Sequence, residues 1–197
     1  KYKQCHLSKD EVPIDVRLTW LYRKANWWLG ERHRRQVEAM AWVRGRHLPL
    51  PPDRLLAIEP LIADAVLCEG GRFAQWLHER GSLLPDDEAL LAAQWALVDR
   101  SVFEIIDLRV DEGLTLRDVR TGDRLDVQER LATRDLRVGW YVLARPLPTG
   151  TGGHQLFGGI AVVPDARLAA FMALLDDEPT PVGLLDLVAS LDAPPSL

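Results

Sequence analysis

Ser101-Val-Phe-Glu-Ile-Ile-Asp-Leu-Arg-Val-Asp-Glu-Gly-Leu-Thr-Leu-Arg-Asp-Val119 is the stretch of sequence that decides the fold. Upstream of it, apolar residues recur at helical steps of three and four, whereas within it they alternate with polar residues. The alternation predicts two strands, over 102–110 and 114–119, joined by a turn at Asp111-Glu-Gly113. A chain that changes from helical to strand periodicity partway along is typical of the α+β class.

The strand pattern continues downstream of this stretch. Thr121-Gly-Asp123 predicts a tight turn. Three further strands are expected over 124–130, 139–145 and 155–163. Alternation in the fourth strand places Trp140, Val142 and Ala144 on one face. The Gly-rich loop 149–154 is interpreted as a hairpin turn, because no helix follows it to support phosphate binding. Five short strands with brief turns predict an antiparallel meander or a small, partly open barrel.

Helical spacing dominates the chain before Ser101. Between residues 12 and 46, one apolar stripe predicts a surface that faces a core, made of Leu18, Leu21, Tyr22, Ala25, Trp28 and Leu29. Gly30 interrupts this pattern, so we expect a helical hairpin, followed by a stiff Pro-rich linker over 49–53. Further helices are expected over 55–68 and 72–79, after Pro85, and, as two short C-terminal helices, over 168–175 and 182–191.

The expected architecture is therefore α+β, with N-terminal helices, a central five-stranded antiparallel meander or barrel, and two short C-terminal helices. A chain of 197 residues is long enough for one domain or two small ones. Beyond residues 1–8, which are considered below, we divide it into a helical region over 9–100, a β region over 101–164, and C-terminal helices and tail over 165–197.

The charge of the chain is unevenly distributed. The net charge is −5, yet residues 1–50 hold 11 of the 24 Lys and Arg and only 5 of the 29 Asp and Glu. A basic end on an acidic body favours an anionic partner, such as RNA, a ribosome or an acidic protein face, or else forms a solvated helix face. Trp20 and Trp27 lie outside the apolar stripe, beside Arg23, Lys24 and Arg34. They are expected to stack on bases, to pack against a neighbouring helix or to support the stems of arginine side chains.

The sequence contains no apolar run of about 18 residues or more, the length that a membrane-spanning helix requires. It also contains no charged-then-apolar leader of the secretory kind. We therefore expect a cytoplasmic protein without membrane association. Cys5 and Cys68 lie far apart in the sequence and do not suggest a disulfide framework. Cys68 is interpreted as a small helix residue rather than a nucleophile.

The first six residues, Lys1-Tyr-Lys-Gln-Cys-His6, place a cysteine directly before a histidine. Thiolates and imidazoles are the ligands of tetrahedral structural zinc sites. This stretch resembles the end of the SEC-C motif, the zinc module at the C-terminus of the SecA translocation ATPase and on many uncharacterised bacterial proteins. That motif runs from Cys-x-Cys, through a spacer rich in Gly, Ser and Lys, to Cys-Cys or Cys-His.

The resemblance implies that Cys5 and His6 are two of four zinc ligands and that residues 1–8 are the remnant of the motif. The chain opens on Lys1 rather than Met, which agrees with a cut through a longer protein. We expect zinc to be bound in the full-length protein and none to be bound in this fragment, because two ligands do not complete a structural metal site. The SecA resemblance further implies contact with a protein or a ribosome.

A second resemblance covers most of the chain from about Leu18 to Pro164. It is carried by Leu77–Glu88, Ser101–Ile105, Leu116–Asp118, Gly122, Gly139 and Ala144-Arg145. These segments are similar to the body attached to SEC-C motifs in actinobacterial hypothetical proteins. That family implies no activity and no catalytic residue.

Signatures of common enzyme classes are missing from the sequence, namely the Gly-Lys-Ser/Thr phosphate loop, the Gly-x-Ser-x-Gly elbow and the His-Glu-x-x-His zinc motif. Asp86, Asp87 and Glu88 are three consecutive acids that fit either acid/base chemistry or the start of a helix. His78 is the histidine that we expect nearest to them. No catalytic residue and no cofactor-binding residue is therefore assigned.

The leading hypothesis is a cytoplasmic interaction module that uses its zinc motif to contact a protein or a ribosome. The first alternative is a nucleic-acid-binding protein that uses the β region and the Trp/Arg helix, although the chain lacks the strongly basic charge typical of such proteins. The second alternative is an enzyme with a site between the helical and β parts, built from His78 and the acids at 86–88.

Overall fold

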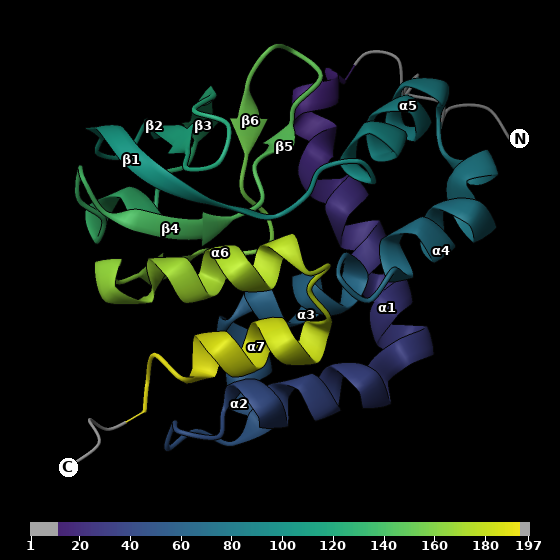
Figure 1. Cartoon of the computed structure of the whole chain (residues 1–197). Helices are drawn as coiled ribbons and strands as arrows, with labels where there is room; N and C mark the ends of the chain where they lie inside the picture. Colours follow the sequence, from purple (N-terminus) through teal and green to yellow (C-terminus); the bar gives the residue numbers. More distant parts are fainter. Residues whose placement is uncertain (1–11, 194–197) are drawn as a thin grey trace, which may run out of the picture.

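A rolled β-sheet forms one part of the molecule, and helices pack against its outer side (Figure 1). The computed structural model describes residues 12–193. Helices α1 to α5 precede the sheet in the chain, and α6 and α7 follow it. The predicted α+β class, with N-terminal helices and two short C-terminal helices, is confirmed.

The first helix, α1 (Ile14–Arg44), consists of two helical segments joined by a sharp kink (Figure 1). The two predicted helical segments are present, but the break lies at His33 (φ −127°, ψ 23°) rather than at Gly30, and no loop separates them. One interior glycine costs a helix about 1 kcal/mol relative to alanine. Buried side chains on both sides of the bend, including Leu29 and Met40, stabilise the helix by more than this cost.

The helix predicted over 55–68 is two helices, α2 (Pro52–Ile58) and α3 (Pro60–Leu67). Glu59 separates them with φ −119° and ψ 89°, because a residue before proline is disfavoured in the helical region. Helices α4 (Arg72–Arg80) and α5 (Asp86–Trp95) form where they were predicted. Gly71 (φ 68°) turns the chain before α4.

The sheet has seven strands rather than the five predicted, in the order β5-β6-β3-β2-β1-β4-β7. The strands are β1 (Ser101–Arg109), β2 (Gly113–Asp118), β3 (Arg124–Gln128), β4 (Tyr141–Ala144), β5 (Leu147–Pro148), β6 (His154–Gln155) and β7 (Ala161–Val163). The sheet is mixed, since β3 and β6 pair in parallel while the other pairs are antiparallel. The predicted loop over 149–154 is confirmed as the hairpin turn between β5 and β6.

The connection between β4 and β5 shows that the sheet is rolled. Only Arg145 and Pro146 join the two strands, so their ends lie at most about 11 Å apart. The same strands stand five places apart in the sheet, which is about 24 Å in a flat sheet. The two edges must therefore approach each other, in the manner of a partly open barrel.

The strand predicted over 155–163 is wrong as one element, because its two ends pair at different places. His154 and Gln155 pair with β3, whereas the residues of β7 pair with β4. Gly158 and Gly159 lie between them, and Gly159 has φ +73°, which interrupts an extended strand. The segment 156–160 thus crosses from one edge of the rolled sheet to the other.

Two cores result from the roll. The interior of the sheet holds an apolar cluster of Phe103, Ile105, Leu114, Leu116, Val127, Leu136, Val142 and Ala144. The outer face contributes Val102, Leu143, Leu147 and Val163 to a larger cluster with the helices. That cluster includes residues of α6 (Leu168–Asp176) and α7 (Pro181–Ala189). The helical and β regions therefore share one core, and the second core belongs to the sheet alone.

Candidate functional site

The predicted zinc ligands Cys5 and His6 lie outside the described residues. Within residues 12–193, no group of three or more His, Cys, Asp or Glu side chains is placed to hold a metal ion. In the same range, no helix combines the length and the apolar composition needed to cross a membrane.

The acids at 86–88 begin helix α5, as predicted, but Asp87 and Glu88 contact α1 rather than a catalytic partner. Arg17 of α1 pairs with Asp87 and donates to Glu88 at 2.9 Å, and Lys24 donates to Glu88 at 2.6 Å. The hydrogen bond from Arg17 holds the pKa of Asp87 below its ordinary value. These contacts tie α5 to α1.

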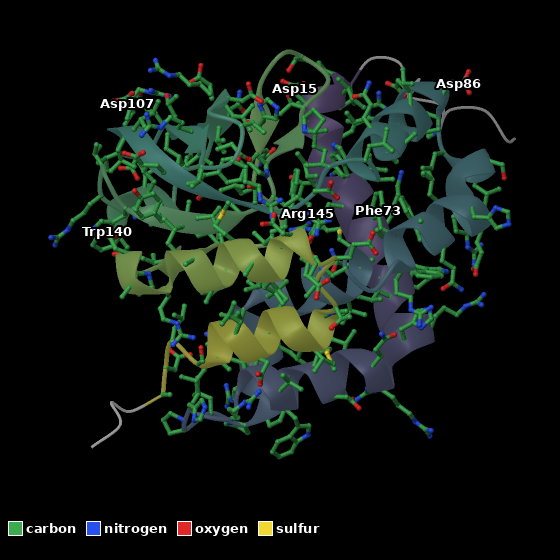
Figure 2. All side chains as sticks on the ribbon, in the orientation of Figure 1. Asp15, Phe73, Asp86, Asp107, Trp140 and Arg145 are labelled. Atoms are coloured by element: carbon green, nitrogen blue, oxygen red, sulfur yellow. The ribbon has the colours of Figure 1, made fainter. Side chains whose placement is uncertain are left out.

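His78 is an exposed residue of α4. Across residues 12–193, no hydrogen bond or ion pair joins it to the acids at 86–88. Figure 2 shows Asp86 near the end of α5, well away from the centre of the molecule. The structure therefore does not assemble the acid/base group that we considered from the sequence.

A buried cluster of four charged residues lies instead where the helices meet the sheet. We call Asp64, Glu69, Arg100 and Arg145 the junction cluster. Asp64 belongs to α3 and Glu69 follows that helix, while Arg100 directly precedes β1 and Arg145 directly follows β4. Asp64 is 0% exposed and Arg100 is 3% exposed. Sequence reasoning did not identify this cluster.

Ion pairs and hydrogen bonds connect the junction cluster. Arg100 pairs with Asp64 through Nη2 and donates from Nε to Glu69 Oε1 at 2.9 Å. Arg145 Nη2 donates to the same Glu69 oxygen at 2.5 Å. The hydroxyl of Tyr22, on α1, donates to Asp64 Oδ1 at 2.8 Å. Because Ser101 pairs with Ala144, both arginines lie at the same end of the antiparallel β1–β4 pair. The cluster therefore joins α1 and the α3 segment to this one end.

Electrostatic effects keep Asp64, Arg100 and Arg145 in their charged forms. Burial disfavours ionisation of Asp64, but Arg145, Arg100 and the Tyr22 hydroxyl outweigh it, so the pKa of Asp64 lies below its ordinary value. Burial likewise works to lower the pKa of Arg100 and Arg145, yet the neighbouring acids raise the pKa of both. Burial, followed by the charge of Asp64, raises the pKa of Tyr22 well above its ordinary value.

The loop at Gly158 packs against this cluster. A Cβ at position 158 would lie 2.1 Å from Asp64 Cγ, so only glycine permits this approach. Phe157, the residue directly before Gly158, stacks on Tyr22 with ring centroids 5.0 Å apart. The crossing segment of the rolled sheet therefore closes one side of the junction cluster.

Three polar atoms of the junction cluster have no hydrogen-bond partner among the described residues: Glu69 Oε2, Arg100 Nη1 and Arg145 Nε. Buried polar atoms are nearly always paired with protein or with water. Leaving one unpaired costs about 1–3 kcal/mol. The cluster thus retains unused hydrogen-bonding capacity.

A cleft of about 520 Å³ adjoins the cluster, and Glu69, Arg100 and Arg145 line it. The aromatic residues Phe73 and Trp95 form part of its wall, and Arg120 and the connection from α6 to α7 border it. Figure 2 shows Arg145 and Phe73 near the centre of the molecule. The cleft lies between the helical and β parts, where an enzyme site was considered, but other residues line it.

Cys68 also lines the cleft. Burial, followed by the charge of Asp64, raises the pKa of its thiol well above the ordinary value. A thiol needs its thiolate form to act as a nucleophile. The chemistry of this site therefore favours binding by polar side chains over covalent catalysis.

A second feature is an exposed stripe on α1, which we call the tryptophan face: Val16, Trp20, Arg23 and Trp27. Trp20 is 62% exposed and Trp27 is 73% exposed. The Arg23 guanidinium lies over the Trp20 ring, 5.5 Å from its centroid. These tryptophans were predicted to lie outside the core stripe, and this is confirmed.

Comparisons of the chain with protein-family models, with curated proteins and with solved structures give no match.

Proposed function

We propose that this protein is a cytoplasmic interaction module that binds an acidic protein surface, free or on a ribosome, through the tryptophan face of α1. The exposure of Trp20 and Trp27 carries the proposal. Large apolar side chains that line up on an exposed face mark interaction sites. Tryptophan and arginine are also the residues that most often dominate binding energy at interfaces.

The charge of the same helix favours an acidic partner. Arg23, Arg32 and Arg35 project from α1, and no carboxylate among residues 12–193 forms an ion pair with them. Complementary charge speeds association and selects among partners. An acidic protein face opposite these arginines meets both requirements.

A protein partner is favoured over a nucleic acid for two reasons. Arg23 lies over the Trp20 ring, where a base would otherwise stack. A nucleic acid also carries a denser negative charge than an acidic protein face, so the net charge of −5 opposes its approach more strongly. Nucleic-acid binding is therefore the alternative outcome of the test.

The zinc motif is the second part of this proposal. Cys5 and His6 stand shortly before α1, the helix that carries the tryptophan face, in the sequence. We propose that the zinc motif and the tryptophan face contact one partner together. Elemental analysis of the protein extended through an upstream Cys-x-Cys is expected to find about one zinc per chain. If the extended protein folds but binds no zinc, the zinc motif is removed from the proposal, and the tryptophan face remains the proposed surface.

Photo-crosslinking tests the tryptophan face directly. A photoreactive residue replaces Trp27 in the full-length protein, and the same residue at Trp42 is the control, since Trp42 is also exposed on α1 but lies beyond the bend. The partner captured from position 27 is then purified. Trp27→Ala is expected to weaken its binding by at least tenfold, and Trp42→Ala to leave it unchanged.

Equal crosslinking from both positions, or equal affinity of both alanine variants, would contradict the proposal. Capture of RNA from position 27, with affinity that falls steeply as salt rises, would support the nucleic-acid alternative instead.

A further inference from the structure

We propose that the cleft beside the junction cluster binds an uncharged, planar cyclic amide, the chemical class that includes lactams and the oxo-nucleobases. This site is distinct from the tryptophan face, and it requires no zinc. The argument rests on the unused polar atoms, the balance of charge and the aromatic wall of the cleft.

The unused polar atoms have the pattern of an amide partner. Arg100 Nη1 and Arg145 Nε are donors, and Glu69 Oε2 is an acceptor. The Arg100 and Arg145 side chains both bond to Glu69 Oε1, so these groups belong to one compact set. A cyclic amide presents a carbonyl oxygen beside an N–H group. Its oxygen accepts from an arginine, and its N–H donates to Glu69.

The charges disfavour an ionic ligand. The two arginines of the junction cluster are balanced by the carboxylates of Asp64 and Glu69. An anion bound to Arg100 would lie close to both carboxylates, and a cation bound to Glu69 would lie close to both guanidinium groups. Neither an anionic nor a cationic ligand gains a net attraction. A neutral group with a donor and an acceptor can bond to an arginine and to Glu69 at once.

The wall of the cleft suits a flat ring. Phe73 and Trp95 both line it, with ring centroids 6.4 Å apart and planes inclined by 35°. The indole N–H of Trp95 donates to Pro148 O at 2.8 Å, so the polar edge of this ring is already used. Phe73 is 5% exposed and Trp95 is 2% exposed, so a ligand meets their apolar ring surface only when the cleft opens. A cleft of about 520 Å³ also falls in the range of roughly 300–1,000 Å³ that is typical of small-molecule sites.

The unused atoms are covered in this conformation, so the ligand requires a small opening of the cleft wall. The connection from α6 to α7 is the segment of that wall with an unusual backbone. Glu178 lines the cleft and has φ +47°, the left-handed region that non-glycine residues rarely adopt. Relaxation of this connection would widen the cleft without moving the sheet.

The test compares pairs of ligands that differ by one methyl group. Uridine and inosine carry the adjacent carbonyl and N–H, whereas 3-methyluridine and 1-methylinosine lack the N–H. Binding to the whole chain is measured by saturation-transfer NMR and titration calorimetry. We expect one or both parent nucleosides to bind, and the methylated form to bind at least tenfold more weakly. Benzoate and benzylamine, an anion and a cation with planar rings, are expected not to compete.

A blocking variant places the ligand in the cleft. Ala74 is an exposed residue of α4 that lines the cleft, so Ala74→Trp is expected to reduce binding at least tenfold. Ala93→Trp makes the same change at an exposed position of α5 outside the cleft and is expected to have no effect. Thermal unfolding confirms that both variants are folded. Both positions lie outside the junction cluster, where substitutions would disturb folding.

Three results would overturn the proposal: no binding of either parent nucleoside, equal binding of the methylated forms, or equal binding by Ala74→Trp and the wild type. The outcome is separable from that of the proposed interaction surface. Trp27→Ala is expected to leave nucleoside binding unchanged, whereas Ala74→Trp is expected to leave partner binding unchanged.

Discussion

Two groups of carboxylates join helices to the rest of the molecule. Glu88 of the first group is as enclosed as Glu69 of the second, and Asp87 is the one that lies half exposed. Asp87 and Glu88 attach α5 to α1 at the edge of the molecule, where Asp87 meets solvent. Asp64 and Glu69 attach α3 to one end of the β1–β4 pair and are almost fully enclosed. Ion pairs in water contribute little to stability, whereas breaking a buried pair leaves a charge without compensation. The junction cluster is thus the more sensitive of the two.

The largest difference is expected between Asp64→Asn and Asp87→Asn. Loss of the Asp64 charge leaves two buried arginines with one carboxylate, so the free energy of unfolding should fall by about 3–5 kcal/mol. Loss of the exposed Asp87 charge should lower it by about 0–1 kcal/mol. Urea unfolding followed by circular dichroism measures both values. Similar losses in the two variants would show that burial does not separate the groups.

Gly158→Ala should weaken the same junction from the opposite side. The new methyl group would overlap the Asp64 carboxylate, and overpacking of this kind costs about 1–3 kcal/mol. Urea unfolding is again the measurement. If Gly158→Ala is as stable as the wild type, the loop does not lie against Asp64.

Acid is expected to lower the free energy of unfolding, and Asp64 should contribute more to this loss than Asp87. Because the pKa of folded Asp64 lies below its unfolded value, its contribution is complete above the ordinary pKa of about 4 and is lost as the pH falls through the lower folded pKa. The free energy of unfolding of the wild type should therefore decrease on acidification below about pH 4. The decrease should be smaller in Asp64→Asn. It should stay close to that of the wild type in Asp87→Asn, where solvent screens the charge. Equal acid dependence in all three proteins would contradict this assignment.

The smallest expected effect concerns the continuity of α1. Gly30 lies inside the helix, and no atom lies within 4 Å of an added Cβ. Gly30→Ala should therefore raise the free energy of unfolding by about 0.5–1 kcal/mol. A loss of stability would indicate that the chain turns at Gly30, as in the hairpin predicted from the sequence.

Much of the fold follows from local patterns. The stripe from Leu18 to Leu29 is buried as predicted, and the change of periodicity at Ser101 marks the start of β1. Val142 and Ala144 share the interior of the sheet, as the alternation requires, whereas Trp140 is partly exposed beside Arg137. These features depend on which side chains neighbour one another along a helix or strand.

The candidate site was harder to predict. Asp64 interrupts the apolar run from Leu61 to Leu67, which is a sequence signal of a buried and paired charge. Its partners Arg100 and Arg145 lie 36 and 81 positions away in the sequence, where nothing local distinguishes them from surface arginines. The acids at 86–88 were more conspicuous because they are consecutive, yet they only join two helices.

The sequence by itself determined the α+β class, the helices and longer strands, and the exposed position of Trp20 and Trp27, because hydrophobic periodicity acts over a few residues. Tertiary structure alone decided the continuity of α1 through Gly30, the roll of the sheet, the parallel β3–β6 pair and the junction cluster. Each of these depends on contacts between distant segments, where burial and paired charge outweigh local preference.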